Sequence, residues 1–463
     1  MSFARVCGTD GSARRNSRKQ NQNFGSSPRI PPNPAGSQPL IYAGTAPFAP
    51  WPFRTEPLAR VGHYLAGGMS ASRKRKMTHF EIQPLHRCAL PDAATFLSRW
   101  FRSGSRGSEA NFAQEDSISI ERRLNWMLLE NPAGRGESRY GFCIRARSGE
   151  IRGLNLCFAA QFVAGDKRIL GLGSGSFFVE PDARLLGFYL FKKYLSLPGY
   201  SFFFTTTSNV NSAPLWQSLG GRAVPGSERE YLFPLNAEAL LPALAAEKYS
   251  SAIVHKLFSV AGRCVNPFLE LSRHSPTALR VTPCRDWCKL AELSGRHRVA
   301  GCITAQRSPD FLQWRYENNE GPPSGVYLVR NSRGDEGWFA LGEMLRGRRR
   351  QIRGTVLLDA VWPRERLSFR ELFRAMLQVV DGRTAAVFFR SRRGVELENC
   401  PRPLIPLNRG VPSTFVIARK GGPPVPCDSL DLVCADGDTA LPLAPRLLGA
   451  AVANPRATVA LRE

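Results

Sequence analysis

Residues 177–195 read FFVEPDARLLGFYLFKKYL, and this stretch decides the fold and the site that we expect. An apolar strand ends at Pro181, and the chain turns at once into a helix. The first amides of a helix lack internal partners and the helix dipole makes that end partly positive, so an anion is stabilised there. Gly187 has no Cβ to block a diphosphate, and Arg184 could contact a phosphate oxygen. Strand, turn and helix with one glycine is a common connection, so this stretch alone leaves an ordinary loop open.

Outward from this stretch, the spacing of apolar residues predicts a mixed α/β fold. Helices that alternate with strands after an antiparallel meander favour a mixed sheet covered by helices. The expected elements are strands at 79–85, 140–147, 151–162, 167–181, 201–207 and 229–235, and helices from Pro91 to Phe101, over 118–131, over 184–196 and over about 210–219.

A second part of the chain repeats this layout. Residues 237–262 look helical and lead into it. Its expected elements are strands at 278–283 and 385–391, a meander over 325–363, and helices at 310–318 and 368–380. Two short matches recur in the same order, L-x-W at 124–126 and 312–314 and V-x-P-x-x-R-L at 179–185 and 361–367. This common order predicts an internal duplication.

Two motifs carry a resemblance to a known family. The run V-x-P-x-x-R-x-x-G that starts at Val179 resembles the acyl-CoA-binding signature of the GNAT acyltransferases, usually V-x-P-x-x-R-G-x-G-x-G/A. Downstream, Asn209 is followed seven residues later by Trp216, and Gly220 then ends the helix, which is similar to the family's second signature. The order of elements is also that of the family.

The resemblance implies a CoA site built largely from backbone. The strand at 175–180, which includes Val179, would pair with the pantetheine arm, and Asn209 would hydrogen-bond that arm. The amides of one short segment would cradle the pyrophosphate, namely those of Arg184, Leu185, Leu186, Gly187, Phe188 and Tyr189. The co-substrate implied is acetyl-CoA or another acyl-CoA, and the acceptor is a small-molecule or peptide amine.

Departures from the family pattern affect the expected chemistry. Leu185 and Tyr189 replace small residues, so the pyrophosphate loop is more crowded than usual. Trp216 stands where the family usually has a catalytic Tyr, and an indole has no acidic phenol with which to protonate a leaving thiolate. The attacking amine needs a general base. Glu180 is the carboxylate nearest to the expected carbonyl, and Glu150 could reach it from a neighbouring turn.

The resemblance implies two GNAT-like domains in tandem, the second degenerate. It covers 79–236 well and 276–420 more loosely, with a helical linker at 237–275 and an irregular tail at 421–463. In the second unit Phe369 takes the place of Gly187, so a pyrophosphate would meet a bulky ring there. We therefore expect one cofactor loop, in the first unit.

Charge is concentrated at the N-terminus. The 463 residues have a formal charge of +25, and residues 1–76 hold twelve Lys or Arg against two Asp or Glu. This Pro- and Gly-rich stretch has the composition of a disordered basic arm. It could tether an anionic surface, or translation could start later, at Met69 or Met77, which is the interpretation we favour. The folded part is then nearer +15.

Other patterns bear on compartment and metal. No apolar run is long enough for a transmembrane helix, and eleven scattered cysteines suit reduced thiols in a cytoplasmic protein. The set Cys284, Cys288, His297 and Cys302 has the residue types of a zinc site, but its spacing departs from the usual forms. We expect Cys284 and Cys288 one turn apart in a core helix, as buried free thiols with no metal. The run GLGSGS at 171–176 precedes a strand and not a helix, so it predicts a bulge where strands splay.

Three functions stay open at this point. The first is acyl transfer from CoA to an amine. The second is a Fem-type transferase, which takes its acyl group from aminoacyl-tRNA and has paired GNAT-like domains. The third is a non-catalytic protein whose basic surface binds RNA or another anion. The retained Arg184 and Gly187 favour the first, so nucleic acid is a possible but not a favoured partner. The sequence leaves the oligomeric state undetermined.

Overall fold

The computed structural model describes residues 80–102, 116–246, 248–273, 277–317, 324–346, 351–390, 400, 403–408, 410–422 and 425–437. All of them belong to one compact unit, which spans Phe53–Glu463. The basic arm expected at 1–76 lies outside the described residues. The structural statements below concern the described residues alone.

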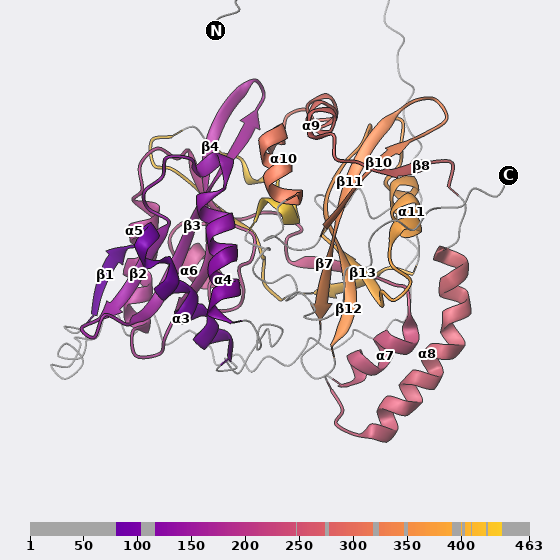
Figure 1. Ribbon diagram of the computed structural model, residues 1–463, viewed down its shortest axis with the longest axis horizontal. Helices are drawn as coiled ribbons and strands as arrows, with labels where there is room; N and C mark the ends of the chain where they lie inside the picture. The colour runs from indigo at the N-terminus through magenta and orange to yellow at the C-terminus, as the bar shows by residue number, and fades with distance from the viewer. Residues whose placement is uncertain are drawn as a thin grey trace, which may run out of the picture. The chain divides into compact units, whose positions relative to one another are not determined.

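The first sheet is built mainly from the N-terminal half of the described chain (Figure 1). Its main path runs β1-β2-β3-β4-β5-β15-β6, in which only the β4–β5 pair is parallel. The strands are β1 (Phe80–Pro84), β2 (Gly141–Ala146), β3 (Ile151–Ala164), β4 (Lys167–Val179), β5 (Phe202–Thr205), β6 (Arg222–Ala223) and β15 (Phe415–Ala418). The short β9 (Ile303–Ala305) also pairs with the end of β3, and β16 (Leu430–Asp431) pairs with β9.

The second sheet has seven strands in the order β8-β10-β11-β12-β13-β7-β14, and only the β12–β13 pair is parallel. The strands are β7 (Arg229–Pro234), β8 (Arg280–Pro283), β10 (Ser324–Arg330), β11 (Glu336–Arg346), β12 (Ile352–Val361), β13 (Ala386–Phe389) and β14 (Ile405–Asn408). Strand by strand, this order and sense of pairing match the main path of the first sheet.

The sixth strand of each sheet comes from the other part of the chain. We expected 229–235 to complete the first unit, but β7 pairs with β13 in the second sheet. In return, β15 pairs with β5 in the first sheet. The same strand order in both sheets is what a duplicated unit would give. The duplication and the domain boundaries at 79–236 and 276–420 remain predictions, now with one strand exchanged.

Helices cover both faces of the first sheet. Along β3, Leu154 and Leu156 face one apolar cluster while Cys157 and Ala159 face another, as the alternation of a strand requires. On the first face pack α3 (Leu90–Arg102) and α4 (Ser117–Leu124), and on the second α5 (Gly187–Leu195) and α6 (Ala213–Ser218). The chain therefore folds as expected into helices around a mixed sheet. By the same alternation, Asn155 of β3 lies on the face of the sheet that α5 covers.

Helices also cover the second sheet. On one face lies α11 (Phe369–Val379), and on the other α9 (Trp287–Arg296) and α10 (Pro309–Tyr316). The expected linker forms two helices that lie side by side, α7 (Ala237–Ala246) and α8 (Ala252–Arg273) (Figure 1).

Two local expectations are wrong. The tail from residue 421 is not irregular throughout, because β16 pairs with β9 and Asp436 is buried. Cys284 and Cys288 do not share a core helix, since Cys284 follows β8 and Cys288 is exposed on α9. Short elements with distant partners account for the first difference, because a two-residue strand has no readable periodicity.

Candidate functional site

The strands β4 and β5, at the centre of the first sheet, are paired over only part of their length. Their parallel pairing ends at Gly173 and Phe204. Beyond Gly173, β4 runs on for six residues with only β3 as a strand partner in the described chain. The edge of β4 that faces away from β3 therefore has no strand partner in the described chain, and an extended chain could pair with it as an added strand.

A bulge marks this opening. The β3–β4 register shifts between Leu154, opposite Phe178, and Leu156, opposite Gly175. The extra residue lies in β4, where Ser176 has a left-handed conformation with φ 49°. Bulges bend a strand and strengthen its twist. The prediction from the GLGSGS run, a bulge where strands splay, is confirmed.

Tyr194 of α5 braces the last point at which β4 and β5 are joined. Its hydroxyl donates to the Leu172 carbonyl at 2.6 Å and lies 3.3 Å from the Phe204 carbonyl, so it touches both strands. The side chain is fully buried, and burial raises the pKa of its hydroxyl well above the usual range. Tyr194 is therefore a neutral donor that holds the two strands at this spacing.

A buried amide lies opposite the bulge. Asn155 on β3 is fully buried, and its Oδ1 accepts a hydrogen bond of 2.7 Å from the Ser174 hydroxyl. Its Nδ2 is buried with no hydrogen-bond acceptor in the described chain. A buried donor without a partner costs about 1–3 kcal/mol, so a ligand carbonyl that reached it would recover that loss. Asn155 was not predicted as a site residue; a single Asn within the apolar run 153–160 of β3 was the available signal.

The helix that follows β4 begins with a tight turn. Residues Arg184–Leu186 form a 3₁₀ turn, in which the Leu186 amide donates to Ala183 at 2.9 Å and the Gly187 amide donates to Arg184. The amides of Arg184 and Leu185 have no acceptor among the described residues. Neither Ala183 nor Leu186 caps the turn with its side chain. This end therefore has two amides without an acceptor in the described chain, and the Arg184 side chain beside them is exposed.

Gly187 lies against β4. A Cβ placed on it would be 3.5 Å from Val179 and 3.6 Å from Phe177, which is ordinary van der Waals contact. Alanine therefore fits at this position, whereas a longer side chain would enter the space between α5 and β4. Leu185 and Tyr189, which we expected to crowd this place, are each about half exposed on the helix surface.

The second sheet's helix begins in a contrasting way. Ser368 caps α11 by accepting a 3.3 Å hydrogen bond from the Glu371 amide, and the Glu371 carboxylate accepts one of 2.9 Å from the Ser368 amide. Phe369, at the position that corresponds to Gly187, is buried against Phe373 and Phe389. An anion is disfavoured where a carboxylate already fills the helix start. Of these two equivalent helix starts, only that of α5 is open.

Glu180, our candidate base, is occupied by two arginines. One carboxylate oxygen lies 2.9 Å from Nη2 of Arg99, and the other lies 2.8 Å from Nε of Arg152. Arg152 also pairs with Asp182 at 2.6 Å, and Glu150 pairs with both arginines. Both oxygens of Glu180 are thus engaged in ion pairs in this arrangement. The structure gives Glu180 and Glu150 a place in an ion-pair network at the exit of β4.

The second motif lies just after β5. The Oδ1 of Asn209 accepts hydrogen bonds from the amides of Asn211 at 2.9 Å and Ser212 at 3.2 Å, which organises the start of α6. Its Nδ2 makes no hydrogen bond in the described chain and could donate to a ligand.

Trp216 lies in the core between α5 and α6. Its side chain is 2% exposed, and its ring packs edge-on against Phe191 at 4.7 Å and is stacked with Phe415. The structure thus gives Trp216 a packing role in the core, away from solvent. Phe188 is half-buried, with Nζ of Lys192 4.6 Å above its ring.

A cavity of about 440 Å³ lies elsewhere, lined by residues of the β3–β4 hairpin, α9 and β12. None of the predicted site residues lines it. The described residues contain no group of three His, Cys, Asp or Glu side chains that could hold a metal ion. Within the same residues, no helix is long and apolar enough to cross a lipid bilayer.

Comparison with known proteins gives structural matches only. No family model and no curated protein sequence matches the chain. N-myristoyltransferase of Saccharomyces cerevisiae with bound myristoyl-CoA is similar at 10% identity and a TM-score of 0.45, over 78% of this chain and 84% of that one. A GCN5-related N-acetyltransferase from Anabaena variabilis gives 11% and 0.44, over 74% and 73%, and one from Kribbella flavida gives 13% and 0.42, over 73% and 70%. The chain is thus similar in structure to these acyltransferases.

Proposed function

We propose that the protein is an acyltransferase that takes its acyl group from an acyl-CoA and transfers it to an amine. The observation that carries this proposal is the open edge of β4 at the bulge, which leads directly into an uncapped helix start. Both features lie on one continuous segment, in the order in which CoA presents its pantetheine arm and its pyrophosphate.

The open edge suits the pantetheine arm. That arm is an extended chain with two amide groups, so it can pair with a strand edge as an added strand would. Beyond Gly173, the backbone of β4 has no strand partner on the side away from β3 within the described residues. Asn155 Nδ2 and Asn209 Nδ2 supply two further donors for its carbonyls, the first from beneath the bulge and the second from beyond β5.

The helix start suits the pyrophosphate. The amides of Arg184 and Leu185 have no acceptor in the described chain, and the exposed Arg184 side chain adds a positive charge. An α-helix of nine residues, Gly187–Leu195, contributes its dipole to the same end. This cradle uses fewer amides than the resemblance implied, because those of Leu186 and Gly187 already donate within the turn.

The reaction would be direct transfer. The amine nitrogen attacks the thioester carbonyl, the C–N bond forms and the C–S bond breaks, the amine gives its proton to solvent water, and CoA leaves as the thiolate. Backbone donors at the bulge would stabilise the oxyanion. We assign no base to Glu180, whose two oxygens are held by Arg99 and Arg152. Acetyl-CoA is the donor to test first, and a small-molecule or peptide amine is the acceptor class.

Calorimetric titration of acetyl-CoA into the full chain tests the proposal. Gly187→Glu would place a carboxylate between α5 and β4, and we expect it to abolish binding. Gly187→Ala is the matched control, since its Cβ meets only ordinary contacts, and it should bind within about twofold of wild type. Absence of heat with every acyl-CoA tried, or equal binding by Gly187→Glu, would contradict the proposal. RNA binding with a steep salt dependence that survives Gly187→Glu would favour the two alternatives, a Fem-type transferase or a non-catalytic RNA-binding protein.

A further inference from the structure

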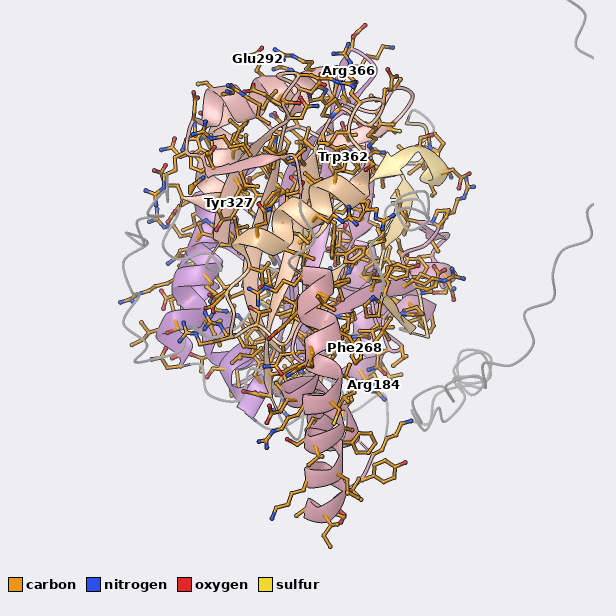
Figure 2. All side chains as sticks on the ribbon, turned by 90° about the vertical axis from the view of Figure 1, so that its right-hand side faces the viewer. Arg184, Phe268, Glu292, Tyr327, Trp362 and Arg366 are labelled. Atoms are coloured by element: carbon orange, nitrogen blue, oxygen red, sulfur yellow. The ribbon has the colours of Figure 1, made fainter. Side chains whose placement is uncertain are left out.

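The helix α8 (Ala252–Arg273) has an exposed apolar face along its whole length. In Figure 2 this helix is turned toward the viewer, and Phe268 on it is labelled. Six apolar side chains form one line, and we call them the α8 seam. Its members, all exposed, are Ile253, Leu257, Val260, Cys264, Pro267 and Leu271. Ile253 and Leu271, at its two ends, are 72% and 73% exposed. Soluble proteins rarely leave a continuous apolar line uncovered.

The opposite face of α8 is already in use. Gly262 and Leu269 are buried, and a Cβ on Gly262 would be 2.5 Å from the Ala237 carbonyl of α7. Asn266 accepts a 2.7 Å hydrogen bond from the Ala237 amide, and Arg273 donates to the Val380 carbonyl at 2.7 Å. These contacts fix the rotation of α8 and leave the seam directed away from α7.

The spacing of the seam indicates what would cover it. Its members follow one another at intervals of four, three, four, three and four residues. This alternation is the heptad spacing by which one helix packs along another, with knobs in holes. Gly262 and Leu269 then fall at the heptad position opposite the seam, in agreement with their burial. The occupant that fits is a second helix of the same period.

We propose that the seam joins two copies of this chain through an antiparallel α8–α8 pair. In that arrangement Lys256 of each copy lies beside Glu270 of the other, so two opposite-charge pairs flank the seam. In the described chain, neither side chain has an ion-pair partner of its own. A parallel pair would instead place Lys256 beside Ala261 of the second copy and leave Glu270 beyond the last facing residue of α8, with no charge complement.

The middle of the antiparallel pair is also accommodated. The two copies of Arg263 would face each other, but each is neutralised by Glu238 of its own α7 at 2.6 Å. On the other flank, Ala261 of one copy would contact Ala261 of the second copy. Val254 would contact Phe268 of the second copy, so that apolar side chains pack together there. Pairing of residue with residue around a two-fold axis is the usual geometry of a homodimer.

Sedimentation equilibrium on the full chain tests this dimer. Lys256→Glu alone and Glu270→Lys alone each create two like-charge pairs, and each should weaken dimerisation by roughly tenfold. The double variant restores opposite charges and should recover the wild-type dissociation constant. Val260→Lys buries two charges at the centre of the seam and should leave monomer. Every substituted side chain is exposed in the single chain, so circular dichroism should show an unchanged fold.

A membrane surface would give a different pattern. Sedimentation with phosphatidylglycerol vesicles would then be weakened by Lys256→Glu but strengthened by Glu270→Lys, because only net charge matters to an anionic surface. Monomeric wild type at every concentration reached, or a double variant no better than the singles, would overturn the proposal.

Discussion

Trp126 and Trp314 donate hydrogen bonds to each other's backbone. The indole Nε1 of Trp126 donates to the Trp314 carbonyl at 3.0 Å, and that of Trp314 donates to the Trp126 carbonyl at 2.9 Å. The rings are stacked with centroids 5.1 Å apart, and the Arg315 guanidinium lies over both. These are the two tryptophans of the repeated L-x-W match. Equivalent positions of the proposed repeats therefore meet in a reciprocal contact.

Removal of either indole donor should destabilise the protein. Trp314→Phe keeps most of the ring but leaves the Trp126 carbonyl without its donor, which costs about 1–2 kcal/mol of unfolding free energy. Trp126→Phe should cost a similar amount, and the two effects should not add, because each bond depends on the same stacked geometry. Urea denaturation measures this. Trp287→Phe, whose Nε1 donates to the exposed Glu317 carboxylate, is the control and should change the free energy by less than about 0.5 kcal/mol.

The buried charges around Arg307 should be costly to break. Arg307 is 7% exposed and pairs with Asp359 at 2.5 Å and with Asp436 of the tail at 2.7 Å. Arg307→Met removes the guanidinium that pairs with two buried carboxylates, which should lower the free energy of unfolding by about 3–5 kcal/mol. Arg135→Met removes the exposed pair with Asp310 and serves as the control. Equal effects of the two variants would contradict the buried network.

The amide of Asn155 should serve the ligand more than the fold. On a Ser174→Ala background, where no hydroxyl loses its acceptor, Asn155→Leu removes a buried donor that has no acceptor in the described chain, so we expect stability to change little. Acetyl-CoA should bind the variant roughly tenfold more weakly, since a ligand carbonyl loses its donor. Calorimetry provides the readout, and Ser174→Ala, which leaves the Asn155 Nδ2 in place, is the control. Unchanged affinity in Asn155→Leu would remove Asn155 from the site.

One histidine should make stability depend on pH. Burial lowers the pKa of His297, and the charges of Arg296 and Arg366 act in the same direction. The folded chain therefore binds this proton less readily than the unfolded chain, whose His has a pKa of about 6.5. The stabilisation is complete above that value and is lost as pH falls through the window below it. His297→Gln should flatten the wild-type slope in this window. Identical slopes for wild type and His297→Gln would contradict this.

Local patterns predicted most long elements, and distant contacts explain the rest. The strand at 151–162 and the helix at 368–380 appear as β3 and α11 because their apolar residues repeat with a clear period. The four-residue β15 has no such period, and its place depends on pairing with β5, far away in sequence. The exchange of β7 and β15 was also not predictable from the sequence. Either strand could pair with β5 or with β13, because the same backbone groups form the hydrogen bonds in both cases.

The site was predicted in part for similar reasons. The bulge and the open helix start follow from glycines and a turn within one segment. The occupation of Glu180 depends on Arg99, which is 81 residues away, so spacing near Glu180 gave no sign of it. Trp216 satisfied a motif by position, but the aromatic residues around it made it a core residue. Asn155 carried a signal, since a buried amide in an apolar strand requires a partner.

Hydrogen exchange of the full chain with and without acetyl-CoA tests the central claim most directly. If the pantetheine arm pairs with the open edge of β4 and the pyrophosphate contacts the start of α5, amides at 174–179 and at 184–185 gain protection on binding. Amides of the equivalent segment 356–361 in β12 then stay unchanged, because the capped start of α11 holds no phosphate. Saturation with acetyl-CoA that leaves 174–185 unprotected, or protects β12 instead, would contradict the account.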